Sequence, residues 1–135
     1  MSGDSPQINV EQIHRIKGLE KGHWVFQWRV ENRTNRFLRL CSVRVPHGKF
    51  KAAERELKPG LEIGAGKNSI IDLLVVCDEP AGAIVENAFL IFLVQWLEAK
   101  WRLFVRLRVT INQQGEPETA TELITNQRVG FSGVS

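Results

Sequence analysis

The segment from residue 87 to residue 112 carries the pattern that most constrains the fold of this chain. Residues 88–96 are almost wholly apolar, and residues 101–111 alternate apolar and polar side chains. A period of two is typical of a β-strand with one buried face, and the short break at residues 97–100 allows the two runs to pair as an antiparallel hairpin. We expect Trp96 to pair with Trp101. One face of the hairpin is then apolar throughout and must lie in the core, with Ala88, Leu90, Phe92, Val94 and Trp96 opposite Val109, Leu107, Val105, Leu103 and Trp101.

Alternation and turn residues predict strands on both sides of this hairpin. Residues 22–32 place Trp24, Phe26, Trp28 and Val30 on one face, and an Asn-rich turn at residues 32–35 leads into a second apolar run at 37–45. We expect these two runs to form a hairpin, with a bulge near Cys41 and Ser42 and an end at Pro46. Further strands are predicted at 8–16, 70–77 and 119–129, the last at a sheet edge.

The stretch from His47 to Ser69 lacks strand alternation. Phe50, Ala53 and Leu57 fall at helical spacing, so we predict a loop with a short helix near residues 49–57, followed by a turn at residues 58–60. The whole pattern predicts a single all-β domain over residues 1–135, an antiparallel β-sandwich of about seven strands.

Three features in sequence order resemble the immunoglobulin-like β-sandwich superfamily. They are the strand and Asn-rich turn from Trp28 to Asn35 running into Phe37–Leu40, the Leu57-Lys58-Pro59-Gly60 turn, and the Ala65-Gly66 turn before Ile70 to Val76. The resemblance covers about half of the chain and implies the architecture, which hosts adhesion, inhibition, scaffolding and accessory roles. The sequence departs from the antibody type because no Trp lies between Cys41 and Cys77.

Composition and the N-terminal sequence indicate the expected class and location of the protein. The chain has 135 residues, of which 43% are hydrophobic and 24% charged, as in ordinary globular domains. The N-terminus is polar, unlike a secretory signal, and no apolar run reaches membrane-spanning length, so we expect a cytoplasmic protein that does not bind membranes. Two reduced thiols are then the expected state of the two cysteines, with a Cys41–Cys77 bridge as the alternative if the protein is exported.

No motif in the sequence predicts catalysis, a metal site or a cofactor. His14, His23 and His47 stand apart and lack further ligands at metal-site spacing. The segment from Gly60 to Ser69 fails the phosphate-loop pattern, because Leu61 occupies the first glycine position and Asn68 follows Lys67. We therefore expect no catalytic residues and no metal ligands.

The second face of the central hairpin is the expected site of function. It combines apolar residues with arginines, a mixture that is favoured at protein interfaces, and the predicted partner-binding residues are Phe89, Ile91, Leu93, Arg102, Phe104, Arg106 and Arg108. The partner would be another protein or a second copy of this chain in a homodimer. The alternative is that the loop at 47–69 or a terminal segment covers this face within the chain.

Nucleic-acid binding is the second functional hypothesis. Residues 1–55 hold eleven Lys or Arg against five Asp or Glu, an excess that attracts phosphate. The phosphate contacts would come from Arg29, Arg33, Arg36, Arg39 and Arg44.

Overall fold

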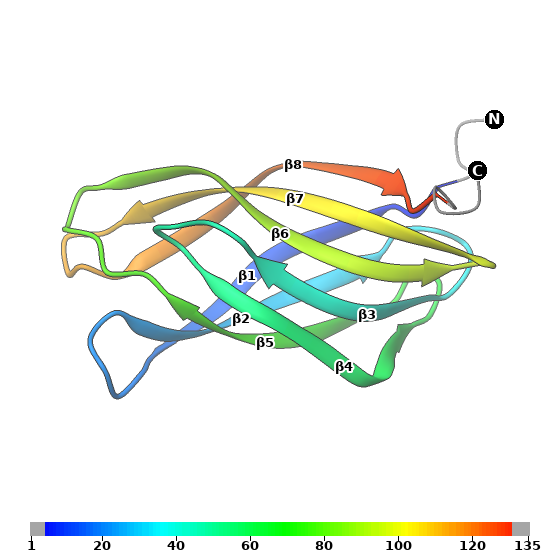
Figure 1. Cartoon of the computed structure of the whole chain (residues 1–135), viewed down its shortest axis with the longest axis horizontal. Helices are drawn as coiled ribbons and strands as arrows, with labels where there is room; N and C mark the ends of the chain where they lie inside the picture. Colours follow the sequence, from blue (N-terminus) through cyan, green and yellow to red (C-terminus); the bar gives the residue numbers. More distant parts are fainter. Residues whose placement is uncertain (1–4, 131–135) are drawn as a thin grey trace.

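The alternating segments form eight antiparallel strands in two sheets in a computed structural model, which describes residues 5–130 (Figure 1). The three-stranded sheet has the order β1-β2-β5, and the five-stranded sheet has the order β4-β3-β6-β7-β8. No helix occurs between residues 5 and 130. The strands are β1 (Ile8–Lys17), β2 (His23–Asn32), β3 (Leu38–Val45), β4 (Ala52–Ile63), β5 (Asn68–Val76), β6 (Ile84–Trp96), β7 (Ala99–Ile111) and β8 (Pro117–Arg128).

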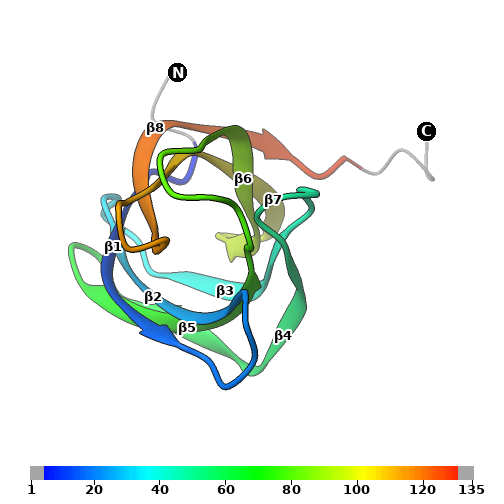
Figure 2. The same ribbon diagram turned by 90° about the vertical axis from the view of Figure 1, so that its left-hand side faces the viewer.

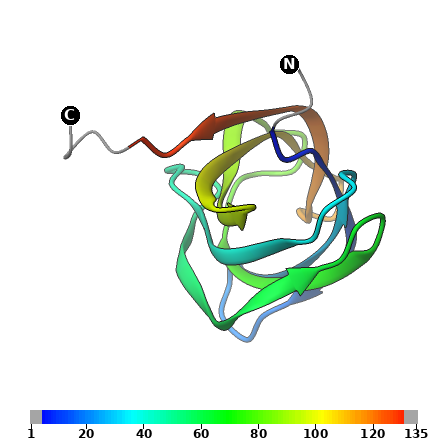
Figure 3. The same ribbon diagram turned by 90° about the vertical axis from the view of Figure 1, so that its right-hand side faces the viewer.

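The predicted core faces meet between the two sheets. Seen from either end, the strands surround a single interior (Figures 2 and 3). Trp28 and Phe26 of β2 stack with their ring centroids 5.2 Å apart, and Phe50, from the loop before β4, packs edge-on against Phe26. The apolar face predicted for the central hairpin is buried except for Trp101, which is half-buried. These faces confirm the all-β sandwich.

Side chains close the sandwich where β1 and β8 meet. These strands belong to different sheets and form no ladder, but Thr121 Oγ1 donates to the Val10 carbonyl at 2.8 Å. Gln12 Oε1 accepts a hydrogen bond from the Thr119 N–H at 2.7 Å. Arg15 spans the same seam, with its guanidinium 3.0 Å from the Pro117 carbonyl and 2.9 Å from Glu116 Oε1. The two edge strands are therefore held together without backbone pairing.

The chain crosses from one sheet to the other at Asn32, whose side chain is fully buried. Its Nδ2 lies 2.8 Å from the Arg36 carbonyl, 2.9 Å from the Ile63 carbonyl and 3.2 Å from the Gly64 carbonyl. Its Oδ1 accepts from the Thr34 N–H at 2.9 Å. One side chain thus joins the end of β2, the turn that follows and the end of β4.

This crossing overturns the expected hairpin between residues 22–32 and 37–45. β2 pairs with β1 and β5, whereas β3 pairs with β4 and β6. The error has a physical reason: both runs have one apolar face, and such faces can meet across the core as well as lie side by side in one sheet. The bulge predicted near Cys41 and Ser42 is confirmed, since the register of β3 shifts there against both neighbours.

The short helix predicted near residues 49–57 is wrong. Residues 52–63 form β4, an edge strand of the five-stranded sheet. Most of its side chains are exposed, so its sequence lacks the apolar alternation by which strands are recognised. The helical spacing of Phe50 and Leu57 is coincidental. Residues 58–60, predicted as a turn, lie inside β4 opposite the bulge at Cys41.

The central hairpin is confirmed, but its register differs by two residues from the prediction. Trp96 pairs with Ala99, and Val94 pairs with Trp101. The turn consists of Leu97 and Glu98, with Leu97 at a φ of 57°, where Gly or Asn is usual. No such residue marks the turn in the sequence. Because the shift is even, every side chain keeps its predicted face.

Asn32→Asp tests the crossing. The substitution keeps the shape of the side chain but directs a carboxylate at three carbonyl oxygens in a buried position, so we expect it to lower the free energy of unfolding by about 3–5 kcal/mol. Urea denaturation measures the change. Asn35→Asp, at an exposed position of the same turn, is the control and should change stability by less than about 0.5 kcal/mol. Equal effects of the two substitutions would contradict the role given to Asn32.

Candidate functional site

The outer face of the five-stranded sheet presents the predicted partner-binding residues as cross-strand rows. One row runs from Arg44 through Ile91 to Phe104, and the next contains Leu93 beside Arg102. Phe89 pairs with Arg106, which in turn pairs with Leu123 of β8. The three predicted apolar residues of β6 and Phe104 are half-buried, while Leu123 is 49% exposed. We call this surface the outer face.

Within the described part of the chain, the outer face is covered only by neighbouring side chains of the same sheet. The alternative was cover by the segment at residues 47–69 or by a terminal segment. Residues 52–63 of the first instead widen the sheet as β4, and the ends at 1–4 and 131–135 lie outside the described residues. The backbones of the two sheets approach each other most closely at the edges, β4 with β5 and β8 with β1. On the outer side of β6 and β7, Arg102 and Arg108 are exposed, and the apolar side chains between them are half-buried.

The apolar centre of the outer face is bordered by cations. The sheet register adds Arg39, Arg44 and Lys100 to the three predicted arginines. Arg39 contacts Glu62, and Arg106 Nε lies 3.5 Å from Glu122 Oε1. Within residues 5–130 the other cations of this face form no ion pair: Arg44, Lys100, Arg102 and Arg108. Hydrophobic periodicity could not place Arg39 and Arg44 here, because it does not reveal that β3 lies beside β6.

The five arginines of the nucleic-acid hypothesis are divided between different surfaces. Arg29 lies in β2, on the outer side of the three-stranded sheet, and contacts Glu11. Arg33 and Arg36 lie in the turn that joins the sheets. Arg39 and Arg44 belong to the outer face defined above. The fold thus brings two of the five together with the hairpin arginines and leaves the other three elsewhere.

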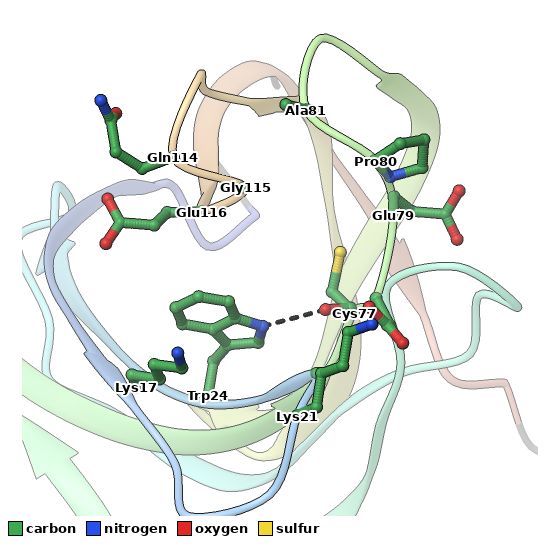
Figure 4. Close-up of a pocket in the computed structure, with 12 residues that line it drawn as sticks. Lys17, Lys21, Trp24, Cys77, Glu79, Pro80, Ala81, Gln114, Gly115 and Glu116 are labelled. Atoms are coloured by element: carbon green, nitrogen blue, oxygen red, sulfur yellow. Dashed lines mark hydrogen bonds between the residues drawn. The ribbon is translucent and has the colours of Figure 1, made fainter.

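A pocket of about 550 Å³ opens at one end of the sandwich, between the β1–β2 turn, the segment after β5 and the β7–β8 turn (Figure 4). Trp24 lines it and donates from Nε1 to the Cys77 carbonyl at 2.9 Å. The Arg15 guanidinium lies 6.0 Å from the centroid of the Trp24 ring. The lining contains both cations and carboxylates, so its charge favours no ligand class: Lys17 and Lys21, with Asp78, Glu79 and Glu116.

Cys77 is the nucleophilic side chain of this pocket, and its environment suppresses its reactivity. Burial, reinforced by the charges of Glu79 and Asp78, raises the pKa of the Cys77 thiol to about 11. At neutral pH almost none of it is the reactive thiolate. Both cysteines are free thiols, and the bridge between Cys41 and Cys77 does not form. The pocket therefore provides no activated nucleophile from this residue.

The described residues contain neither a metal-binding cluster nor a membrane-spanning helix. Residues 5–130 contain no cluster of His, Cys, Asp and Glu side chains suited to holding a metal ion. Nor does that part of the chain contain a helix long and apolar enough to cross a lipid bilayer.

Comparison with known proteins does not assign a family. No protein-family model matches the sequence, and no curated protein matches it. Among the solved structures that are similar to the chain is an X-ray structure described as Northeast Structural Genomics Consortium target SoR45. The match covers 90% of this chain and 83% of that chain, with 11% sequence identity and a TM-score of 0.32. A likeness this loose carries no inference about function.

The raised pKa of Cys77 predicts a loss of stability at high pH. Between the ordinary thiol pKa of 9.0 and pH 11, the unfolded chain releases the thiol proton while the folded protein keeps it, so unfolding becomes easier as pH rises. Relative to Cys77→Ala, the wild-type protein should lose roughly 2 kcal/mol across this range. Urea denaturation at pH 8 and pH 11 measures the difference. Parallel pH profiles for the two proteins would contradict the assignment.

Proposed function

We propose that the protein is a non-enzymatic interaction module of the immunoglobulin-like type, which binds a partner protein through the outer face. The observation that carries the proposal is a half-buried apolar centre, formed by Phe89, Ile91, Leu93 and Phe104. It lies on the side of β6 and β7 that faces away from the three-stranded sheet. Exposed apolar patches with a polar rim are typical of binding sites, and arginine and aromatic residues are favoured there.

Strand order supports the immunoglobulin-like part of the proposal. β1, β2 and β5 share one sheet, and β3, β6 and β7 lie side by side in the other. The same division is made in immunoglobulin domains by strands A, B and E and strands C, F and G. β8, which follows β7 at the sheet edge, is an addition to that pattern.

Charge favours an acidic partner over a second copy of the chain. Two copies packed with their outer faces together would bring two positively charged surfaces into contact, each with Arg44, Arg102 and Arg108 unpaired within the described residues. Like charges at an interface cost several kcal/mol, whereas carboxylates on a partner would complement them. We therefore infer that the partner carries Asp or Glu around an apolar contact.

Ile91→Glu and Arg102→Glu test the outer face. Each change should abolish or sharply weaken binding, because one puts a charge into the apolar centre and the other repels an acidic partner. Proteins recovered with the tagged chain from cell extract are compared among wild type, the two variants and two controls. The controls are Leu19→Glu, in the fully exposed β1–β2 turn, and Lys67→Glu, in the β4–β5 turn.

The expected result is a partner that is recovered by the wild type and both controls and lost with both outer-face variants. Its affinity, measured with the purified proteins, should fall as salt concentration rises. Folding of each variant is checked by circular dichroism. A folded Ile91→Glu protein that keeps every partner would refute the proposal. So would light scattering that shows a dimer for the wild type and a monomer for Ile91→Glu.

Nucleic-acid binding remains the alternative use of the basic residues, and Arg39 and Arg44 would then act with the hairpin arginines. A gel shift with single- and double-stranded DNA and RNA at low salt decides between the two hypotheses. A shift that disappears steeply with added salt and is lost with Arg44→Glu would favour nucleic acid.

A further inference from the structure

The edge of β5 that faces β4 has free backbone groups along most of its length. Within residues 5–130, β5 forms a ladder with β2 alone, and its contact with the opposite side is one bridge between Lys51 and Val76. These two residues exchange hydrogen bonds of 3.0 and 2.8 Å. Because the backbone groups of a strand alternate in direction, Ile70, Asp72 and Leu74 turn their N–H and C=O groups to the same side as Val76.

Only one of these groups finds a partner within the described residues. The Arg55 guanidinium of β4 donates a hydrogen bond to the Asp72 carbonyl. This contact is exposed, so releasing it costs little. The seam between β1 and β8, by contrast, is closed by several side chains along its length. The β5 edge is therefore the less protected of the two seams.

Apolar side chains and a hollow surface lie beside this edge. Ile70 is 51% exposed, Leu74 74% and Val76 45%. Two adjoining pockets of about 390 and 360 Å³ separate β4 from the 70–74 part of β5. Free backbone groups next to exposed apolar side chains are the combination that extended peptides use when they add a strand to a sheet.

The charge along the edge indicates which strand would fit. Three charged side chains line the pocket between β4 and the middle of β5: Asp72, Glu54 and Arg55. Within the described residues none of the three takes part in an ion pair, so the two carboxylates outnumber the one cation. A basic residue directly opposite Asp72 would be stabilising. A second copy of β5, paired about a two-fold axis at Asp72, would instead set two carboxylates against each other.

We propose that the β5 edge binds an extended segment of a partner protein as a fourth strand, antiparallel to β5. The segment carries Lys or Arg opposite Asp72 and apolar residues opposite Ile70 and Leu74. This site lies on the three-stranded sheet and uses backbone hydrogen bonds, so it is separate from the outer face. Its test does not depend on the function proposed for the outer face.

Two synthetic nine-residue peptides test the site with the full chain. The first is Thr-Ser-Val-Thr-Lys-Thr-Val-Ser-Thr, and the second has Glu in place of its Lys. Binding is followed by amide chemical shifts in NMR spectra. The Lys peptide should shift the amides of residues 70–74 and bind about fivefold more tightly than the Glu peptide, and Asp72→Lys should reverse this preference.

Backbone methylation of the Lys peptide distinguishes strand addition from binding by side chains alone. Residues opposite Ile70, Asp72 and Leu74 direct their N–H groups at β5. N-methylation of the Val, Lys and Val residues should therefore abolish binding, whereas N-methylation of the two Thr residues between them should leave it intact. The proposal is overturned if neither peptide shifts these amides at millimolar concentration, if Asp72→Lys leaves the preference unchanged, or if both methylated peptides bind alike.

Discussion

The buried amide of Asn32 is the interaction on which the arrangement of the two sheets depends. Its side chain binds the Arg36, Ile63 and Gly64 carbonyls, and its backbone exchanges hydrogen bonds with the Gly64–Lys67 turn, through Lys67 O and Gly66 N. A carboxylate could not donate to these carbonyls, and an aliphatic side chain would leave them unpaired in the interior. The end of β2 and both ends of the β4–β5 connection are thereby fixed relative to one another.

Both candidate binding surfaces follow from this crossing. Since β3 leaves the first sheet, it pairs with β6 and brings Arg39 and Arg44 to the rim of the outer face. The same departure leaves β5 with one ladder partner, so within the described residues its far edge is bonded only through the Lys51–Val76 bridge and the contact of Arg55 with Asp72. The two surfaces differ in chemistry, because the outer face would bind through side chains and the β5 edge through backbone groups.

The errors of prediction have specific physical causes. The helix expected near 49–57 is the edge strand β4, where exposure removes the alternation by which strands are recognised. The predicted hairpin register differs by two residues from the observed one. Leu97 adopts the left-handed conformation of the turn, which a leucine in the sequence does not indicate. The other strands, the core face of the hairpin and the bulge at Cys41 were predicted correctly because each depends on local apolar periodicity.

The sequence by itself determined which face of each strand is buried, since alternation of apolar residues needs no knowledge of neighbours. It therefore also identified the hairpin residues from Phe89 to Arg108 that point away from the core. Only the tertiary structure decided that β4 extends the sheet instead of covering it, that Arg44 borders the outer face, and that β5 forms a ladder on one side alone. Those properties depend on contacts between residues far apart in the chain, and local periodicity carries no information about them.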